Sequence, residues 1–251
     1  NPDLSVWVVT GDGDAMSIGG NHLIHVLRRN FNLNILMFNN RIYGLTKGQY
    51  SPTSELGKIT KSTPMGSLDY PFNPPQLALG ASGTFIARTI DREQKHMAAV
   101  IQAASDHHGT SFVEIYQNCN IFNDGAFAEL TEKETKGETQ LILEHGQPMI
   151  FGAENNKGLI LDGANFKIVI IGKDYSINDI LKHNIYDKNL AMLLSEITYI
   201  PELPVPLGIL YKEEKPTYED MMNEQIQQAI DLQGKGNIEK LIIGNNSWEV
   251  K

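Results

Sequence analysis

The fold of this chain is constrained most by two strand-like runs on either side of a helix pattern. Each of the two runs ends on polar residues. Residues 4–9 form an apolar, β-branched run that ends at the Gly-Asp-Gly-Asp of residues 11–14. Helical apolar spacing follows over residues 18–29, and a second apolar run at residues 34–38 ends at Asn39–Asn40. This order predicts a parallel sheet with helices on its faces, where ligands collect at the carboxyl ends of the strands.

Strand and helix signals continue to about residue 130. Residues 91–94 have the pattern of a capping box, and the helix that they open is predicted to close at Gly109. A third apolar run follows at residues 111–116. These elements predict an α/β domain over residues 1–130, built on a mainly parallel sheet flanked by helices.

The composition changes after residue 130, and we predict a small α+β extension over residues 131–251. Two apolar runs on either side of residues 162–165 predict a β-hairpin. Capping-box patterns at residues 176–179 and 217–220 predict a short helix and a longer one. The longer helix carries an apolar stripe that is typical of core packing, formed by Tyr218, Met222, Ile226 and Ala229.

Charge and composition exclude several classes of function. The formal charge is −9, and residues 129–251 account for −8 of it, which argues against a nucleic-acid partner because phosphate contacts need clustered Lys and Arg. No apolar run reaches membrane-spanning length, and the first residues lack the pattern of a signal peptide. The single Cys119 excludes an intrachain disulfide and suits a reducing compartment. We expect a cytoplasmic protein without a membrane partner.

The two polar steps at the predicted strand ends supply ligands for a hard cation. Asp12 offers a carboxylate and Asn40 an amide oxygen, which suit a Mg²⁺ that holds a diphosphate. Gly13 permits close approach, and the helix N-terminus around Ser17 offers free N–H groups to an anion. An isolated Gly-Asp-Gly is more often a plain surface turn, but the paired asparagines follow Gly13 after 25 residues and favour the cation site.

The ordered series of motifs resembles the thiamine diphosphate motif and, more narrowly, the β subunit of 2-oxoacid:ferredoxin oxidoreductases. Besides Gly-Asp-Gly-Asp and Asn-Asn, it contains IGGNH at 18–22, RRN at 28–30, YGLTKGQ at 43–49 and SPT at 51–53. The resemblance runs over residues 2–129 and weakly to residue 251. It implies a thiamine diphosphate-binding fold in a subunit of an enzyme that oxidatively decarboxylates a 2-oxoacid, forms an acyl-CoA and passes electrons to ferredoxin.

The resemblance also implies roles for single residues. Asp12 and Asn40 are expected to bind Mg²⁺ through their side chains, and Ile42 through its carbonyl. Four residues are expected to contact thiamine diphosphate: Gly13, Asp14, Gly44 and Leu45. Lys47 stands where related enzymes carry a lysine near the substrate carboxylate, a role that a fixed ammonium suits, and a solvated loop lysine is the alternative. The Lys47 loop favours 2-oxoglutarate as substrate, with pyruvate or a mixed range second.

Cys119 raises the question of an iron–sulfur cluster. Followed by Phe122 and Asn123, it resembles a family ligand to a [4Fe-4S] cluster, which takes four thiolates, and this sequence has one. The family's other cysteines lie upstream of the diphosphate motif. We therefore expect that an N-terminal segment is missing; otherwise the sequence cannot hold the cluster. A small buried apolar residue is the alternative role for Cys119.

The sequence thus predicts a β subunit that is inactive alone. The resemblance implies that a separate α subunit supplies the acid–base glutamate, and that ferredoxin, coenzyme A and the 2-oxoacid are the other partners. Two further functions stay open at this point. One is a nonoxidative thiamine diphosphate decarboxylase or transferase, which needs no cluster, and the other is a catalytically silent module that binds Mg²⁺ and a diphosphate.

Overall fold

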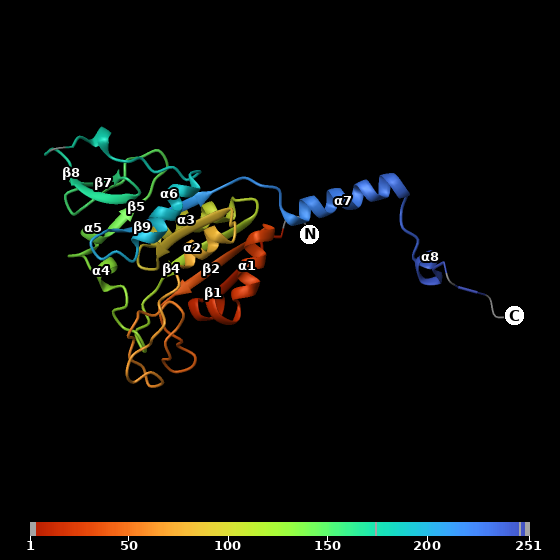
Figure 1. Ribbon diagram of the computed structural model, residues 1–251, viewed down its shortest axis with the longest axis horizontal. Helices are drawn as coiled ribbons and strands as arrows, with labels where there is room; N and C mark the ends of the chain where they lie inside the picture. The colour runs from red at the N-terminus through yellow and green to blue at the C-terminus, as the bar shows by residue number, and fades with distance from the viewer. Residues whose placement is uncertain (1–3, 174, 246, 249–251) are drawn as a thin grey trace.

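The computed structural model describes residues 4–173, 175–245 and 247–248 around a central six-stranded sheet (Figure 1). The order of its strands is β1-β2-β4-β3-β9-β5. The strands are β1 (Trp7–Gly11), β2 (Leu33–Asn39), β3 (Phe85–Ile90), β4 (Thr110–Tyr116), β5 (Gln140–Ile142) and β9 (Val205–Lys212). The strands β1 to β4 are parallel, whereas β9 runs antiparallel to β3 and parallel to β5. The predicted mainly parallel α/β fold is confirmed.

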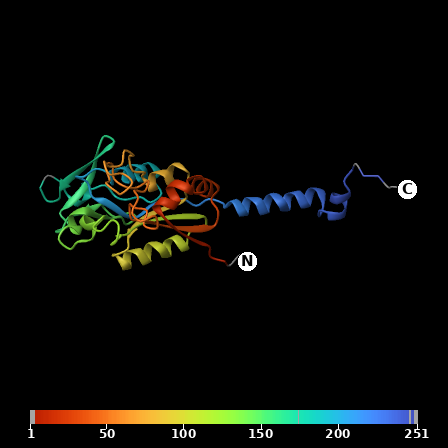
Figure 2. The same ribbon diagram turned by 90° about the horizontal axis from the view of Figure 1, so that it is seen from below.

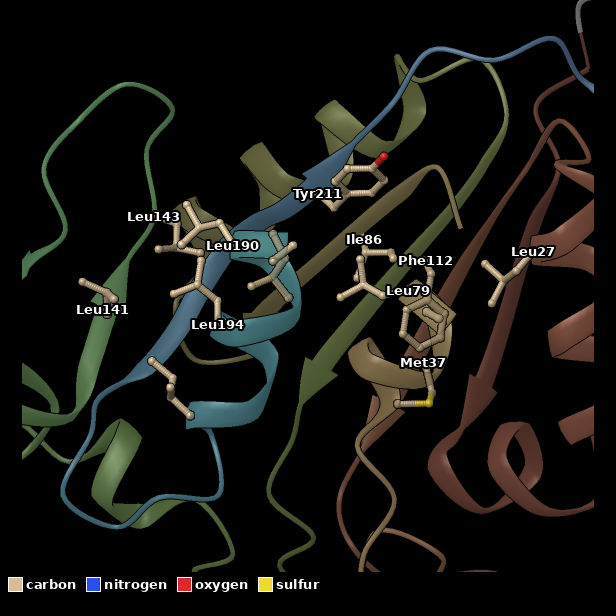
Figure 3. Packing of buried hydrophobic residues seen from close by; sticks show 14 of the residues in the cluster. Leu27, Met37, Leu79, Ile86, Phe112, Leu141, Leu143, Leu190, Leu194 and Tyr211 are labelled. Atoms are coloured by element: carbon tan, nitrogen blue, oxygen red, sulfur yellow. The ribbon is translucent and has the colours of Figure 1, made fainter. Parts of the chain in front are cut away.

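Helices cover both faces of this sheet, because each buries an apolar stripe against the strands. The helices are α1 (Gly20–Arg29), α2 (Pro74–Gly80), α3 (Gln94–Ser105) and α6 (Lys188–Ile197). On one face, α1, α2 and α6 share a buried cluster with the strands that includes Leu27, Leu79, Leu194, Met37, Ile86 and Phe112 (Figure 3). The helix α3 lies on the other face (Figure 2). Its residues Val100 and Ala104 pack against β3 and β4.

The sheet and its core cross the domain boundary predicted at residue 130. Both β5 and β9 come from the second half of the chain, and Leu141 and Leu210 lie in the same buried cluster as Leu27. The second half therefore completes the sheet of the first. The division into two domains stays a prediction.

The second half of the chain also contains smaller elements near β5, at the edge of this sheet (Figure 1). They are the helices α4 (Ala128–Thr131) and α5 (Lys136–Thr139), a three-stranded sheet of β6 (Ile150–Phe151), β7 (Lys157–Asp162) and β8 (Asn165–Ile170), and the 3-10 helix η2 (Ile177–Asp179). The antiparallel pair β7 and β8 confirms the predicted hairpin. Ser176 and Asp179 form the predicted capping box of η2.

The last two helices, α7 (Tyr218–Gln233) and α8 (Ile238–Ile243), project from the body of the molecule (Figures 1 and 2). The capping box of Thr217 and Asp220 opens α7 as predicted. The expected core packing of α7 is wrong: its residues, all of which the structure describes, are unburied, and Met222 and Ile226 are 42% and 51% exposed. Periodicity gives a helix an apolar side but does not place a neighbour there. No helix within the described ranges is long and apolar enough to cross a membrane.

The start and end of α3 also differ from the sequence prediction. The helix begins after Glu93, and the Glu93 side chain makes no capping hydrogen bond. Asp91 does not open the helix, because its N–H donates to the Tyr116 carbonyl at 3.0 Å and extends the ladder of β3 and β4. The predicted capping box at residues 91–94 is therefore wrong. The helix ends at Ser105, ahead of Gly109.

Candidate functional site

The carboxyl ends of β1 and β2 bring two predicted ligands to one edge of the sheet. The strands are parallel, and Gly11 is paired with Phe38, so that Asp12 and Asn39 follow at the same level. Asp12 is only 2% exposed, and the backbone N–H of Asn40 donates to its carboxylate. The structure therefore places the Asp12 carboxylate beside the paired asparagines.

Two hydroxyl groups from the long loop after β2 hold the Asp12 carboxylate. Ser51 Oγ and Thr53 Oγ1 lie 2.5 Å and 2.6 Å from the same oxygen, Asp12 Oδ2, and both residues are buried. Burial raises the pKa of Asp12, and the hydrogen bonds from Ser51, Thr53 and the backbone oppose this rise. Both hydroxyls contact Oδ2, so neither occupies the other carboxylate oxygen, Asp12 Oδ1. Ser51 and Thr53 stand in the quoted SPT motif, but the sequence assigned no role to either.

Asn40 and Ile42, the other two predicted metal ligands, flank a strained residue. Arg41 has a φ of +56°, a left-handed conformation that costs a non-glycine residue about 1–2 kcal/mol. Three hydrogen bonds hold this turn: Asn39 Oδ1 accepts from the Arg41 N–H at 3.2 Å, Asn40 Oδ1 accepts from the Ile42 N–H at 3.3 Å, and Ser54 Oγ donates to the Arg41 carbonyl at 2.6 Å. These contacts fix the turn between Asn40 and Ile42 and the direction of Asn40 Oδ1.

Gly13 is required for a reason that the sequence did not reveal. Its backbone is helical, with φ −64° and ψ −44°, and it directly precedes the π-helix η1 (Asp14–Ile18). A Cβ at this position would lie 2.0 Å from Cε1 of Tyr43, whose hydroxyl donates to the Gly13 carbonyl at 3.1 Å. The glycine therefore admits the Tyr43 ring. The helical backbone begins at Asp12, earlier than the predicted start near Ser17.

A cavity of about 270 Å³ adjoins these residues. It shares Ser51 with the Asp12 site and Tyr43 with the Gly13 contact, and Met16 and Ser17 of η1 also line it. Clefts that enclose a complete cofactor-sized molecule usually measure about 300–1,000 Å³. The volume of this cavity lies just below that range.

The remaining predicted contacts lie elsewhere or in solvent. Asp14 is exposed and lines a separate apolar cavity between β1 and α1. Gly44, Leu45 and Lys47 belong to a turn closed by pairing of Tyr43 with Gln49, in which Leu45 is 99% exposed and Lys47 has a φ of +68°. None of these four described residues is among the hydrogen-bond partners of the Asp12 carboxylate, and their roles stay predictions.

Cys119 lies half-buried on the loop after β4, and Asn123 connects this loop to the site. The Asn123 N–H donates to the Cys119 carbonyl, and Asn123 Nδ2 donates to the Asn40 carbonyl, both at 2.9 Å. A [4Fe-4S] cluster takes four thiolates, and this chain has one. Within the described ranges, no group of three or more His, Cys, Asp or Glu comes together as a metal site. Cys119 can supply one of these four thiolates, and its role as a cluster ligand stays a prediction.

Comparisons with known proteins bear on the same region. Residues 1–115 match the family described as thiamine pyrophosphate enzyme, C-terminal TPP binding domain. The 2-oxoglutarate oxidoreductase subunit KorB of Mycobacterium tuberculosis is 48% identical over 252 residues, covering 99% of this chain and 67% of that protein. The 2-oxoacid:ferredoxin oxidoreductase subunit beta of Saccharolobus solfataricus is 42% identical over 49% of this chain. The chain belongs to this β-subunit family.

A solved structure shows the same likeness in three dimensions. A 2-oxoglutarate:ferredoxin oxidoreductase from Magnetococcus marinus, with 2-oxoglutarate, coenzyme A and succinyl-CoA bound, matches 97% of this chain and 67% of that chain with a TM-score of 0.70 and 30% identity. The chain spans 67% of the M. tuberculosis relative, and its match spans 41% of the S. solfataricus relative. The family, the thiamine diphosphate-binding fold and the enzyme class predicted from the sequence are confirmed.

Proposed function

We propose that this β subunit provides the thiamine diphosphate and Mg²⁺ half of a 2-oxoglutarate:ferredoxin oxidoreductase. The observation that carries the proposal is the buried Asp12 carboxylate beside the Asn39–Ile42 turn, at the carboxyl ends of two parallel strands. The names of the M. tuberculosis relative and of the M. marinus structure both mention 2-oxoglutarate, which supports this substrate.

The donor set at this edge suits Mg²⁺. Asp12 and Asn40 would hold the ion through side-chain oxygens and Ile42 through its carbonyl, and diphosphate oxygens and water would supply the remaining ligands. Burying a carboxylate is costly unless a cation pairs with it. The ion pairs found among the described residues do not include Asp12, so a bound cation would supply this missing charge.

In the proposed enzyme, bound thiamine diphosphate supplies the electron sink for decarboxylation. The residues of this chain bind and orient. Asp12, Asn40 and Ile42 would hold Mg²⁺ against the diphosphate end, Tyr43 lines the adjoining cavity, and the Lys47 ammonium would bind the substrate carboxylate. An α subunit completes the site and supplies its acid–base group, coenzyme A takes the acyl group, and ferredoxin takes the electrons.

Calorimetry with thiamine diphosphate and Mg²⁺ tests the proposal. We expect the wild-type subunit, in complex with its partner subunit, to bind them, and Asp12→Ala to lose measurable binding. Asp106→Ala is the matched control, because this exposed aspartate caps the C-terminus of α3, at the opposite ends of the strands. Equal binding heats for wild type and Asp12→Ala would exclude the site.

A further inference from the structure

Two neighbouring strands in the centre of the sheet each carry one charged residue that is completely buried. Arg88 of β3 and Glu114 of β4 are partners in the parallel register, and both are 0% exposed. Arg88 Nε lies 2.6 Å from Glu114 Oε2. Removing two charges from water is costly even when they pair, and apolar residues of similar size often serve stability as well. The presence of the pair therefore calls for a role besides stability.

The second carboxylate oxygen of Glu114 points to such a role, because it reaches the candidate site. Asn39 Nδ2 donates to Glu114 Oε1 at 2.8 Å, and all atoms of this contact are buried. An amide group can be placed in two orientations, and its neighbours decide between them. If the Asn39 amide were flipped, its oxygen would face the Glu114 carboxylate and its NH₂ group would face the Arg41 N–H. Glu114 thus fixes the direction of the Asn39 carbonyl oxygen.

The oxygen of Asn39 contacts both sides of the proposed metal site. It accepts the hydrogen bond from the Arg41 N–H at 3.2 Å, which holds the strained turn between Asn40 and Ile42. It also lies 2.9 Å from Thr53 Oγ1, the hydroxyl that contacts Asp12 Oδ2. One buried amide therefore connects Glu114 to all three proposed Mg²⁺ ligands.

We propose that Glu114 is a positioning residue for the Mg²⁺ and diphosphate site and acts through the Asn39 amide. Arg88 makes this possible by balancing the Glu114 charge inside the sheet. The inference rests on the proposed function, because it assigns to Glu114 the orientation of the ligands Asp12, Asn40 and Ile42. Metal affinity then requires a hydrogen-bond acceptor at residue 114. A negative charge at residue 114 is needed only while Arg88 is present.

Two double variants separate this role from the ion pair. Arg88→Met/Glu114→Gln and Arg88→Met/Glu114→Leu both lose the pair, but only glutamine keeps an oxygen that can accept the Asn39 N–H. We would measure the affinity for Mg²⁺ at saturating thiamine diphosphate by calorimetry, and the melting temperature without ligand, with each variant in complex with the partner subunit. Loss of a residue that orients a metal ligand typically weakens metal affinity about 10–100-fold.

We expect the glutamine variant to bind Mg²⁺ like wild type and the leucine variant to bind about 10–100-fold more weakly, at similar melting temperatures. Equal affinities of the two variants would overturn the role of Glu114. If either variant does not fold, Asn39→Ala is measured instead, because it removes the amide through which Glu114 acts and keeps Ser51 and Thr53 on Asp12; an affinity for Mg²⁺ equal to that of wild type would also overturn the role of Glu114. Failure of wild type to bind thiamine diphosphate with Mg²⁺ would instead refute the proposed function.

Discussion

Replacing Gly13 with alanine tests whether the Tyr43 ring is the reason for this glycine. The backbone at Gly13 is helical, so alanine by itself would gain about 1 kcal/mol there. The added Cβ would lie 2.0 Å from Tyr43 Cε1 and 2.6 Å from Cδ1, and overpacking of this kind costs about 1–3 kcal/mol. Moving the ring also breaks the hydrogen bond from its hydroxyl to the Gly13 carbonyl, which contributes about 1 kcal/mol. We expect a net loss of about 1–3 kcal/mol in the free energy of unfolding.

The sign of this effect should reverse when the ring is absent. In a Tyr43→Ala background, the Gly13→Ala change meets no ring atom, and the helical preference of alanine should raise the free energy of unfolding by up to about 1 kcal/mol. Urea denaturation of wild type, both single variants and the double variant gives the coupling energy directly. An equal loss in both backgrounds would refute the reasoning, because Gly13 would then be required by something other than Tyr43. Thiamine diphosphate binding by the double variant further reports whether the diphosphate also approaches Gly13.

Three further predictions follow from other parts of the chain. In the enzyme reconstituted with its partner subunit, Lys47→Ala should raise the KM for 2-oxoglutarate about tenfold or more and leave cofactor affinity unchanged, because a charged hydrogen bond contributes about 1.5–3 kcal/mol. The exposed Lys61→Ala should change the KM little. An unchanged KM in Lys47→Ala would reject the role. Arg88→Met should lower the free energy of unfolding by about 3–5 kcal/mol, because it leaves Glu114 buried without its partner. In urea denaturation, adding Glu114→Leu should recover most of this loss, and no recovery would contradict the pairing. Burial lowers the pKa of His107 from 6.5 to about 4. As the pH falls, this histidine takes up a proton in the unfolded chain before it does so in the folded chain. Its contribution to the free energy of unfolding is therefore complete above pH 6.5 and is lost towards pH 4. His107→Gln should flatten that stretch of the pH profile and the exposed His25→Gln should not, and identical profiles for wild type and His107→Gln would count against it.

Sequence patterns predicted those parts of the structure that neighbouring residues decide. The capping box at Thr217 opens α7, and the β7–β8 hairpin forms where two apolar runs flank a turn. The carboxyl ends of β1 and β2 meet because parallel pairing puts the ends of consecutive strands at one edge. This rule alone placed Asp12 beside the paired asparagines.

Contacts between distant segments could not be predicted in the same way. Nothing local to β9 shows that it lies between β3 and β5, and the apolar stripe of α7 looks the same whether or not a neighbour covers it. The pair of Arg88 and Glu114 left a signal that was missed. Each is a lone charge inside an apolar strand, and two such charges of opposite sign indicate a buried pair once the strands are known to be adjacent.

The two ends of the proposed site differ in burial and in hydrogen bonding. At the metal end, Asp12, Asn39 and Glu114 are buried and hydrogen-bonded, so the proposed ligands of Mg²⁺ are held before any ion arrives. At the substrate end, the turn that carries Lys47 is exposed and Leu45 is 99% exposed. A bare ammonium in water attracts a carboxylate only weakly, and the attraction increases when water is excluded. Strong binding by Lys47 would therefore need water to be excluded around its turn, whereas the proposed ligand Asp12 is already buried within this chain.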